Sequence, residues 1–144
     1  MLENNVSKTV LINASVAKVW DTITNPILIK QWVSDAVMSV TSDFKVGSSI
    51  NFEGAWSNVE HSDTGTILKF EKEKVFQYTS WSKITRLPNI PENHSLIEFT
   101  LSPDEGKVLL TITHSNLIAK ASYEHSNFYW GTTLQVIKKL AESK

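Results

Sequence analysis

The sequence predicts an α+β fold in which a β-sheet packs against one long C-terminal helix. Apolar residues recur at helical spacing from Ser122 to Glu142, a length that corresponds to a helix of about 30 Å. Almost the whole chain between residues 36 and 115 instead shows strand patterns. Because a sheet with one apolar face must bury that face, we expect the C-terminal helix to cover it.

The composition of the 144-residue chain is typical of one globular domain, which we place at residues 1–144. The formal net charge is −1 and Arg86 is the one arginine, so no basic surface for nucleic acid is expected. The chain has no cysteine, which excludes disulfides and thiolate metal sites. No apolar run reaches the roughly 18 residues of a membrane span, and no signal peptide is visible. We therefore expect a cytoplasmic monomer or small homo-oligomer.

The N-terminal part is expected to form one strand and two short helices. Val6–Ile12 is rich in β-branched residues, which favours a strand. Ser15 is suited to cap the first helix, and Asn25 with Pro26 to begin the second. The apolar residues of the two helices recur at helical spacing: Val16, Val19, Trp20 and Ile23, then Leu28, Ile29, Trp32 and Val33. We interpret both tryptophans as core residues because each has a large apolar area to bury.

Alternating patterns and turn residues predict about six further strands before the last helix. They are expected around Ala36–Val40, from Ile50, and at Thr66–Phe70, Val75–Trp81, Leu96–Leu101 and Val108–His114. Two polar segments are expected to be long loops, namely Gly54–Gly65 at the mouth of the sheet and Ile84–Asn93 with its two prolines. In the final helix the predicted apolar stripe consists of Tyr129, Trp130, Leu134, Val136, Ile137, Leu140 and Ala141.

These elements, together with short motifs in the same order, resemble the family named after the activator of Hsp90 ATPase homologue 1, within the START/Bet v 1-like (SRPBCC) superfamily. Val19–Pro26 followed by Trp32 is similar to the family's opening VWxxlTxPxxlxxW signature. The other similar segments are Lys45–Ser48 before Ile50–Phe52, Gly65–Ile67, Tyr78–Trp81, Ile112–His114, and the closing helix with Trp130, Leu134, Ile137 and Leu140. Two positions depart from the pattern, since Ser48 and Tyr129 stand where glycine is usual.

The resemblance implies a helix-grip fold, in which a curved antiparallel sheet is wrapped around the long helix and encloses a cavity. Relatives use such cavities to bind lipids, hormones or polyketides, and a few catalyse cyclisation or hydrolysis there. No shared catalytic set is implied, because the superfamily has none. The tyrosine at position 129 would fill part of the cavity.

Side chains in the middle of strands or of the last helix, on the faces expected to point inward, are the candidates to line the cavity. They are Met38, Phe52, Tyr78, Phe99, His114 and Trp130. His114 shares the parity of Leu110 and Ile112 on one strand, which places it on their inward face. Two interpretations of this histidine stay open: a hydrogen-bonded group at the edge of the core, or one that orients a ligand or transfers a proton.

Neither a catalytic motif nor a metal site is predicted. The chain has no nucleophile elbow, phosphate-binding glycine loop or zinc-protease motif. Glu60, His61 and Asp63 cluster in one segment, but such clusters are usually solvated. Glu53 and Glu98 show no pairing that acid–base catalysis would need. No cofactor is expected.

Three functions follow from these observations. The first is an intracellular protein that binds a hydrophobic or aromatic small molecule between sheet and helix, which the aromatic inward face favours. The alternative is a cyclase- or hydrolase-type enzyme with His114 and Tyr78 as its polar groups. The third, which we expect least, is an interaction with an Hsp90-type chaperone, suggested by the family name.

Overall fold

The computed structural model describes residues 5–33, 37–56, 59–82, 86–117 and 120–143, and for Met38, Trp56 and residues 59–61 it describes the backbone alone. Its elements follow the chain as β1 (Val6–Ile12), α1 (Val16–Thr24), α2 (Pro26–Val33), β2 (Val37–Ser42), β3 (Ser49–Trp56), β4 (Val59–Glu71), β5 (Val75–Ser82), the short 3₁₀ helix η2 (Pro91–Asn93), β6 (Ser95–Asp104), β7 (Lys107–Ser115) and α3 (Lys120–Glu142).

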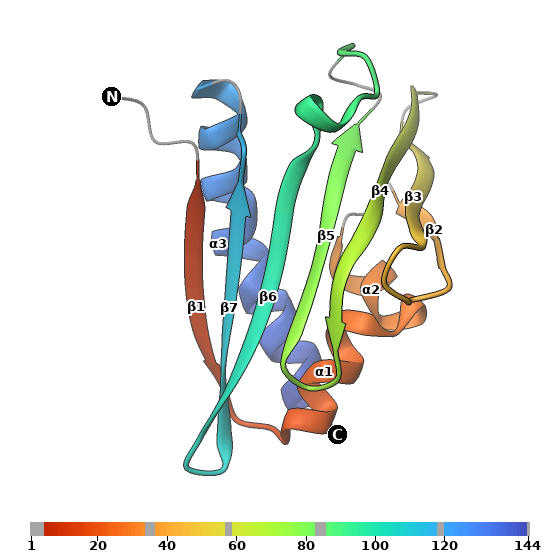
Figure 1. Cartoon of the computed structure of the whole chain (residues 1–144). Coiled ribbons are helices and arrows are strands. Elements are labelled where there is room, and N and C mark those ends of the chain that lie inside the picture. The colour runs from red at the N-terminus through yellow and green to blue at the C-terminus, as the bar shows by residue number, and fades with distance from the viewer. Residues whose placement is uncertain (1–4, 34–36, 57–58, 83–85, 118–119, 144) are drawn as a thin grey trace.

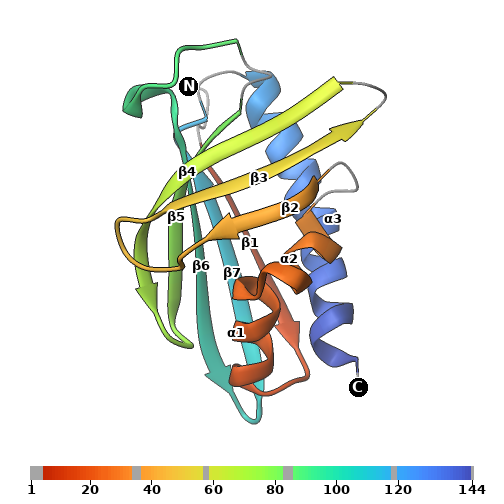
Figure 2. The same cartoon turned by 90° about the vertical axis from the view of Figure 1, so that its right-hand side faces the viewer.

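The strands form one antiparallel sheet in the order β1-β7-β6-β5-β4-β3-β2 (Figure 1). Each pair of sequential strands from β2 to β7 is adjacent, and β1 forms the edge of the sheet next to β7. Figure 2 shows that the sheet is strongly curved, because β2, β3 and β4 run across the direction of β6 and β7. Helix α3 lies in the concavity of the sheet. Helices α1 and α2 lie beneath β2, at the other end of the sheet from β1. The helix-grip prediction is therefore confirmed.

Local hydrogen bonds explain where the two short helices begin. The Ser15 side chain accepts from the backbone N–H of Lys18 at 3.1 Å and caps α1. The Asn25 side chain accepts from the backbone N–H of Ile27 at 3.0 Å, which satisfies a free donor at the start of α2. The Trp32 indole donates to the carbonyl of Thr22 at 2.9 Å and so holds the two helices together.

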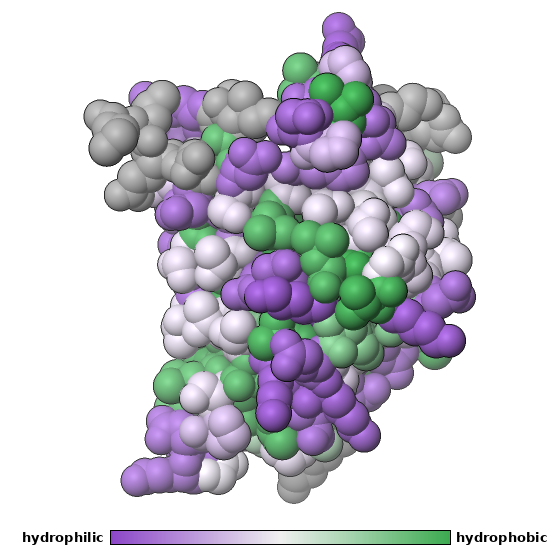
Figure 3. All heavy atoms as spheres, in the orientation of Figure 1, coloured by the Kyte–Doolittle hydropathy of each residue, from purple (hydrophilic) through white to green (hydrophobic). Residues whose placement is uncertain are grey.

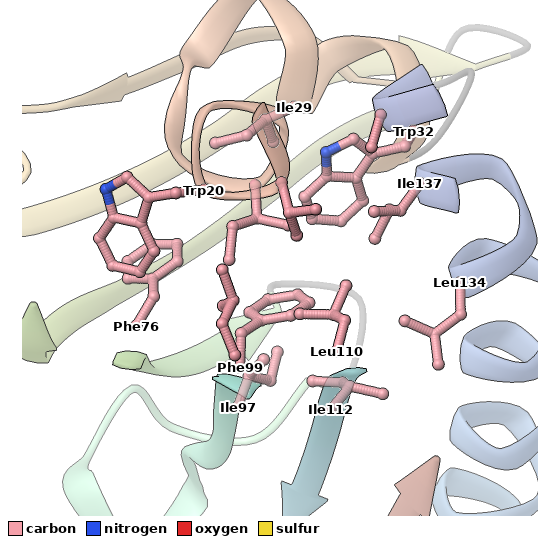
Figure 4. Packing of buried hydrophobic residues seen from close by; sticks show 14 of the residues in the cluster. Trp20, Ile29, Trp32, Phe76, Ile97, Phe99, Leu110, Ile112, Leu134 and Ile137 are labelled. Carbon is pink, nitrogen blue, oxygen red and sulfur yellow. The ribbon is translucent and has the colours of Figure 1, made fainter. Parts of the chain in front are cut away.

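The hydrophobic core occupies the half of the molecule where α1, α2 and the C-terminal half of α3 meet the sheet (Figure 4). Its largest fully buried side chains include Ile23, Ile29, Phe76, Phe99, Leu110, Ile112 and Ile137. Trp20 and Trp32 are buried in it, as predicted. The buried face of α3 consists of Ser126, Trp130, Thr133, Leu134, Ile137 and Ala141, whereas Val136 of the predicted stripe is 36% exposed.

The predicted loop from Gly54 to Gly65 is wrong, because β3 and β4 extend through its described residues as a long hairpin. The described side chains of this segment are mostly half-buried, so polar residues such as Ser62 and Thr64 are accommodated in its strands. Gly65 lies within β4 and not in a turn, and the reason for a glycine here is the close approach of the neighbouring strand. A Cβ at this position would lie 1.6 Å from the carbonyl oxygen of Thr79, so β4 can approach β5 this closely only with glycine.

The convex face of the sheet carries hydrophilic and hydrophobic residues interspersed (Figure 3). Apolar side chains such as Leu11 and Leu68 are partly exposed on its strands, among threonines and charged residues. In the part of the chain that the structure describes, no helix is long and apolar enough to cross a membrane.

Candidate functional site

A cavity of about 700 Å³ lies between the sheet and the N-terminal half of α3, next to the core. Its apolar lining consists of Val33, Val37, Phe52, Tyr78, Trp81, Leu87, Ile97, Leu117, Ala121, Tyr129 and Trp130. Its polar lining consists of Asp63, Ser80, Ser82, Asn93, Ser95, His114, Asn116, Ser122, His125 and Ser126. Exposed lining residues such as Leu87, Asn116 and Ala121 mark the place where the cavity meets solvent.

The strand register explains where core ends and cavity begins. Phe76, Phe99 and Ile112 are partners across β5, β6 and β7, and this row lies in the core. Two residues further along each strand, the next inward row consists of Tyr78, Ile97 and His114, all of which line the cavity. The row after it pairs Ser80 with Ser95. The inner face of the sheet thus changes from aromatic and aliphatic to hydroxylated as it reaches the cavity.

Four of the six residues proposed from the sequence, Phe52, Tyr78, His114 and Trp130, line this cavity. Phe99 does not, since it is fully buried, stacks on Phe76 with ring centroids 6.2 Å apart, and packs edge-on against Trp130 at 5.6 Å. It lies one row too deep in the sheet to reach the cavity. The side chain of Met38 lies outside the described residues.

His114 is held in a polar network that joins the sheet to α3. Its Nδ1 atom lies 2.7 Å from Ser126 Oγ and accepts from the Trp130 indole N–H at 3.2 Å. Its Nε2 atom lies 2.8 Å from Ser95 Oγ. Because Nδ1 accepts the indole proton, the neutral ring carries its own proton on Nε2 and donates it to Ser95. The Ser95 hydroxyl then donates to the carbonyl of Ser80 at 3.3 Å.

This network requires a neutral imidazole. Burial lowers the pKa of His114 to about 4, and the nearby His125 adds a smaller effect in the same direction. Protonation at Nδ1 would also point an N–H at the indole N–H of Trp130. Both ring nitrogens of His114 are therefore engaged with protein groups at neutral pH.

The two tyrosines of the cavity differ in their hydrogen bonding. The Tyr129 hydroxyl donates to the carbonyl of Val33 and so connects α3 to the end of α2. Its ring packs edge-on against Trp130 at 4.8 Å and stacks on His125 at 6.1 Å. Tyr129 thus forms part of the wall, and the cavity beside it remains hollow. Among the described residues the Tyr78 hydroxyl has no hydrogen-bond partner, although the Tyr78 side chain is only 3% exposed.

Several lining residues were not singled out from the sequence. Ser80 and Ser95 share the inward parity of Tyr78 and Ile97, a signal that was present in the pattern but hidden by their small polar side chains. Ser126 precedes Trp130 by one helical turn and lies on the same face. Asp63 pairs with Phe52 on β3 and Ser82 on β5, in a segment whose polar composition predicts a loop.

The cavity shows no preformed metal centre in the described part of the chain, where no three His, Asp or Glu side chains converge. Of the cluster Glu60, His61 and Asp63 noted in the sequence, the side chains of Glu60 and His61 lie outside the described residues.

Comparison with known proteins gives a family match over almost the whole chain. The family described as Activator of Hsp90 ATPase homolog 1-like protein matches residues 13–142. A search of curated proteins gives no significant match.

Solved structures share the same fold. ChR145 from Cytophaga hutchinsonii is 32% identical, with a TM-score of 0.82 over 99% of this chain and 96% of that one. NE0264 from Nitrosomonas europaea is 18% identical, with a TM-score of 0.77 over 96% of this chain and 94% of the other. A protein from Colwellia psychrerythraea, described as an Aha1 dimer, is 23% identical, with a TM-score of 0.76 over 99% and 97% of the two chains.

Proposed function

The chain belongs to the Activator of Hsp90 ATPase homolog 1-like family, and from this premise we propose that it binds a small, mainly apolar molecule between α3 and the sheet. The observation that carries the proposal is the cavity of about 700 Å³ with aromatic side chains in its wall. Pockets for small molecules typically have volumes of about 300–1,000 Å³, a mainly apolar lining and a few placed polar groups. The cavity has all three properties.

The arrangement around His114 favours binding over catalysis. A general base needs a free lone pair within reach of a substrate proton. Nδ1 of His114 instead accepts from Trp130 and contacts Ser126, and Nε2 is bonded to Ser95. The cyclase or hydrolase alternative would therefore need to break this network before His114 could act.

Interaction with an Hsp90-type chaperone remains a second candidate, supported by the family name alone. Co-purification of such a chaperone with the tagged chain from a cell extract, at a stoichiometry independent of cavity ligands, would favour it. The cytoplasmic location stays a prediction. So does the state of monomer or small homo-oligomer, which light scattering of the purified chain measures directly.

The proposal is tested by thermal unfolding in the presence of fatty acids, sterols, flavonoids and polyketide-like aromatic compounds. A ligand that binds only the folded chain stabilises it by about 2.7 kcal/mol at a hundredfold excess over its Kd. Such a gain shifts Tm by several degrees for a domain of this size. We expect at least one of these classes to raise Tm.

A variant that fills the cavity separates specific binding from surface adsorption. Ser80→Phe places a ring into the cavity from a position whose side chain makes no hydrogen bond among the described residues. Ser102→Phe adds the same ring at an exposed strand position and serves as the matched control. Ligand-induced shifts should vanish in Ser80→Phe and persist in Ser102→Phe. Equal shifts in both variants, or none in the parent, would overturn the proposal.

A further inference from the structure

Among the described residues that line the cavity, Tyr78 carries the most deeply buried hydroxyl without a protein partner. Tyr78 is 3% exposed, lines the cavity, and makes no hydrogen bond to any described residue. No fully inaccessible polar side-chain atom in the described part of the chain lacks a partner, so this oxygen must contact the space of the cavity. A ligand that replaces water beside this hydroxyl must supply a hydrogen-bond acceptor, because a hydroxyl buried without a partner costs free energy.

Several polar groups of the cavity are already engaged, and Ser80, whose hydroxyl makes no hydrogen bond among the described residues, is less buried than Tyr78. His114 is bonded through both nitrogens, and Ser95 and Ser126 are its partners. The Tyr129 hydroxyl donates to Val33. Tyr78 is thus the group best placed to donate a hydrogen bond to a bound molecule. Burial raises the pKa of its hydroxyl, as do Tyr129 and the carboxylate of Asp63 to a smaller degree, so the donor proton is retained at all ordinary pH values.

The charges of the wall restrict the ligand further. The described lining residues include neither lysine nor arginine, and the acidic residue among them is Asp63. Asp63 lines the same cavity as Tyr78 and Tyr129, and its negative charge contributes to the raised pKa values of both hydroxyls. A ligand carboxylate would be taken out of water without a cation among the described lining residues to pair with it, which is strongly unfavourable.

Aromatic rings define the shape of the space around Tyr78. Its ring lies 6.0 Å from that of Phe52, and Tyr129 and Trp130 contribute further rings from α3. Ring faces and edges favour flat aromatic partners over flexible alkyl chains of the same area.

We propose that the cavity selects an uncharged aromatic molecule whose carbonyl or phenolic oxygen accepts a hydrogen bond from Tyr78, and that it rejects carboxylate ligands such as fatty-acid anions. The inference rests on the proposed function, since it defines which small molecule the cavity takes. It makes Tyr78 the residue that determines specificity and leaves His114 to hold α3 on the sheet.

The test uses three naphthalenes substituted at the same ring position, with an acetyl group, an ethyl group or a carboxylate. They are similar in size but differ in hydrogen-bond acceptor and charge. Their Kd values are measured by isothermal titration calorimetry at pH 7.5 with the parent chain, with Tyr78→Phe, and with Tyr123→Phe as a matched control. Tyr123 is a tyrosine of α3 that does not line the cavity.

In the parent, the carboxylate should bind most weakly of the three probes. The preference for acetyl over ethyl should fall about 3- to 10-fold in Tyr78→Phe, the range expected for one neutral hydrogen bond. Tyr123→Phe should keep the parent preference. The ring contacts of residue 78 survive in the phenylalanine variant, so folding is expected to be retained.

The outcomes distinguish this inference from the proposed function. If neutral probes bind but the acetyl preference is the same in Tyr78→Phe and parent, the role of Tyr78 is refuted and cavity binding stands. If the carboxylate binds as tightly as the acetyl compound, the charge selection is refuted. These parent measurements remain decisive even if a variant does not fold. If none of the probes binds and the wider thermal screen is also blank, the proposed function itself fails.

Discussion

Acidification should destabilise the fold through His114, and the size of the effect follows from its environment. The pKa of this histidine is lowered from 6.5 to about 4 by burial. Between these two pH values the unfolded chain binds a proton at this site and the folded chain does not, so stability is fully present above pH 6.5 and decreases as the pH falls. Integrated down to pH 4, the loss from this one group is about 3 kcal/mol.

The assay is urea unfolding followed by fluorescence of the five tryptophans, between pH 7.5 and 4, for the parent and for His114→Gln. The variant removes the titrating group but keeps a polar side chain, so the difference between the two curves cancels the contribution of carboxylates. We expect parent stability to fall relative to the variant by about 3 kcal/mol over this range. His94→Gln, which leaves the contacts of His114 in place, is the control for replacing a histidine outside this network. A difference between parent and His114→Gln that is flat with pH would refute a buried neutral histidine.

Two further substitutions test how the sheet and helix are held. Ile137→Ala, at a fully buried position of α3, should lower the free energy of unfolding by about 2–5 kcal/mol, whereas Val136→Ala, on the exposed side, should change it by less than about 1 kcal/mol. Equal urea midpoints for these two variants would contradict the assigned face of the helix. Gly65→Ala should cost about 3 kcal/mol or more, because the added Cβ would meet the carbonyl oxygen of Thr79 at 1.6 Å and the backbone must move. A Gly65→Ala variant with the parent's unfolding midpoint would show that β4 can move away from β5 at little cost.

The fold could be predicted from the sequence because periodicity and caps are local signals. Ser15 and Asn25 begin the two short helices as their cap chemistry predicts. The error at Val136 has a simple geometric cause: it follows Trp130 by six residues, which is about 240° around a helix and off the buried face. The hairpin through Gly65 was missed because its composition suggests a turn, and only the approach of β5 explains the glycine.

The site could be predicted only in part, since a cavity depends on where rows of side chains stop filling space. Parity identified Tyr78 and Phe99 as inward-facing, and both are. Parity alone does not show that the row of side chains containing Phe99 is packed in the core, whereas the row containing Tyr78 borders the cavity. That distinction depends on which part of α3 lies above each row, and this is a tertiary relation. The partners of His114 were hidden for the same reason, because Ser95 and Ser126 lie on separate elements.

Helix α3 combines two regions with different constraints on one continuous backbone. From Leu134 to Ala141 its inward side chains are packed in the core, where any change of volume is felt throughout the fold. From Ala121 to Trp130 the same helix lines the cavity, and a larger or smaller side chain there changes the cavity volume. Under the proposed function, substitutions in the first turns of the helix, at positions such as Ala121 and Ser122 outside the core and the His114 network, would change which molecules the cavity accepts. The last two turns would continue to hold the helix on the sheet.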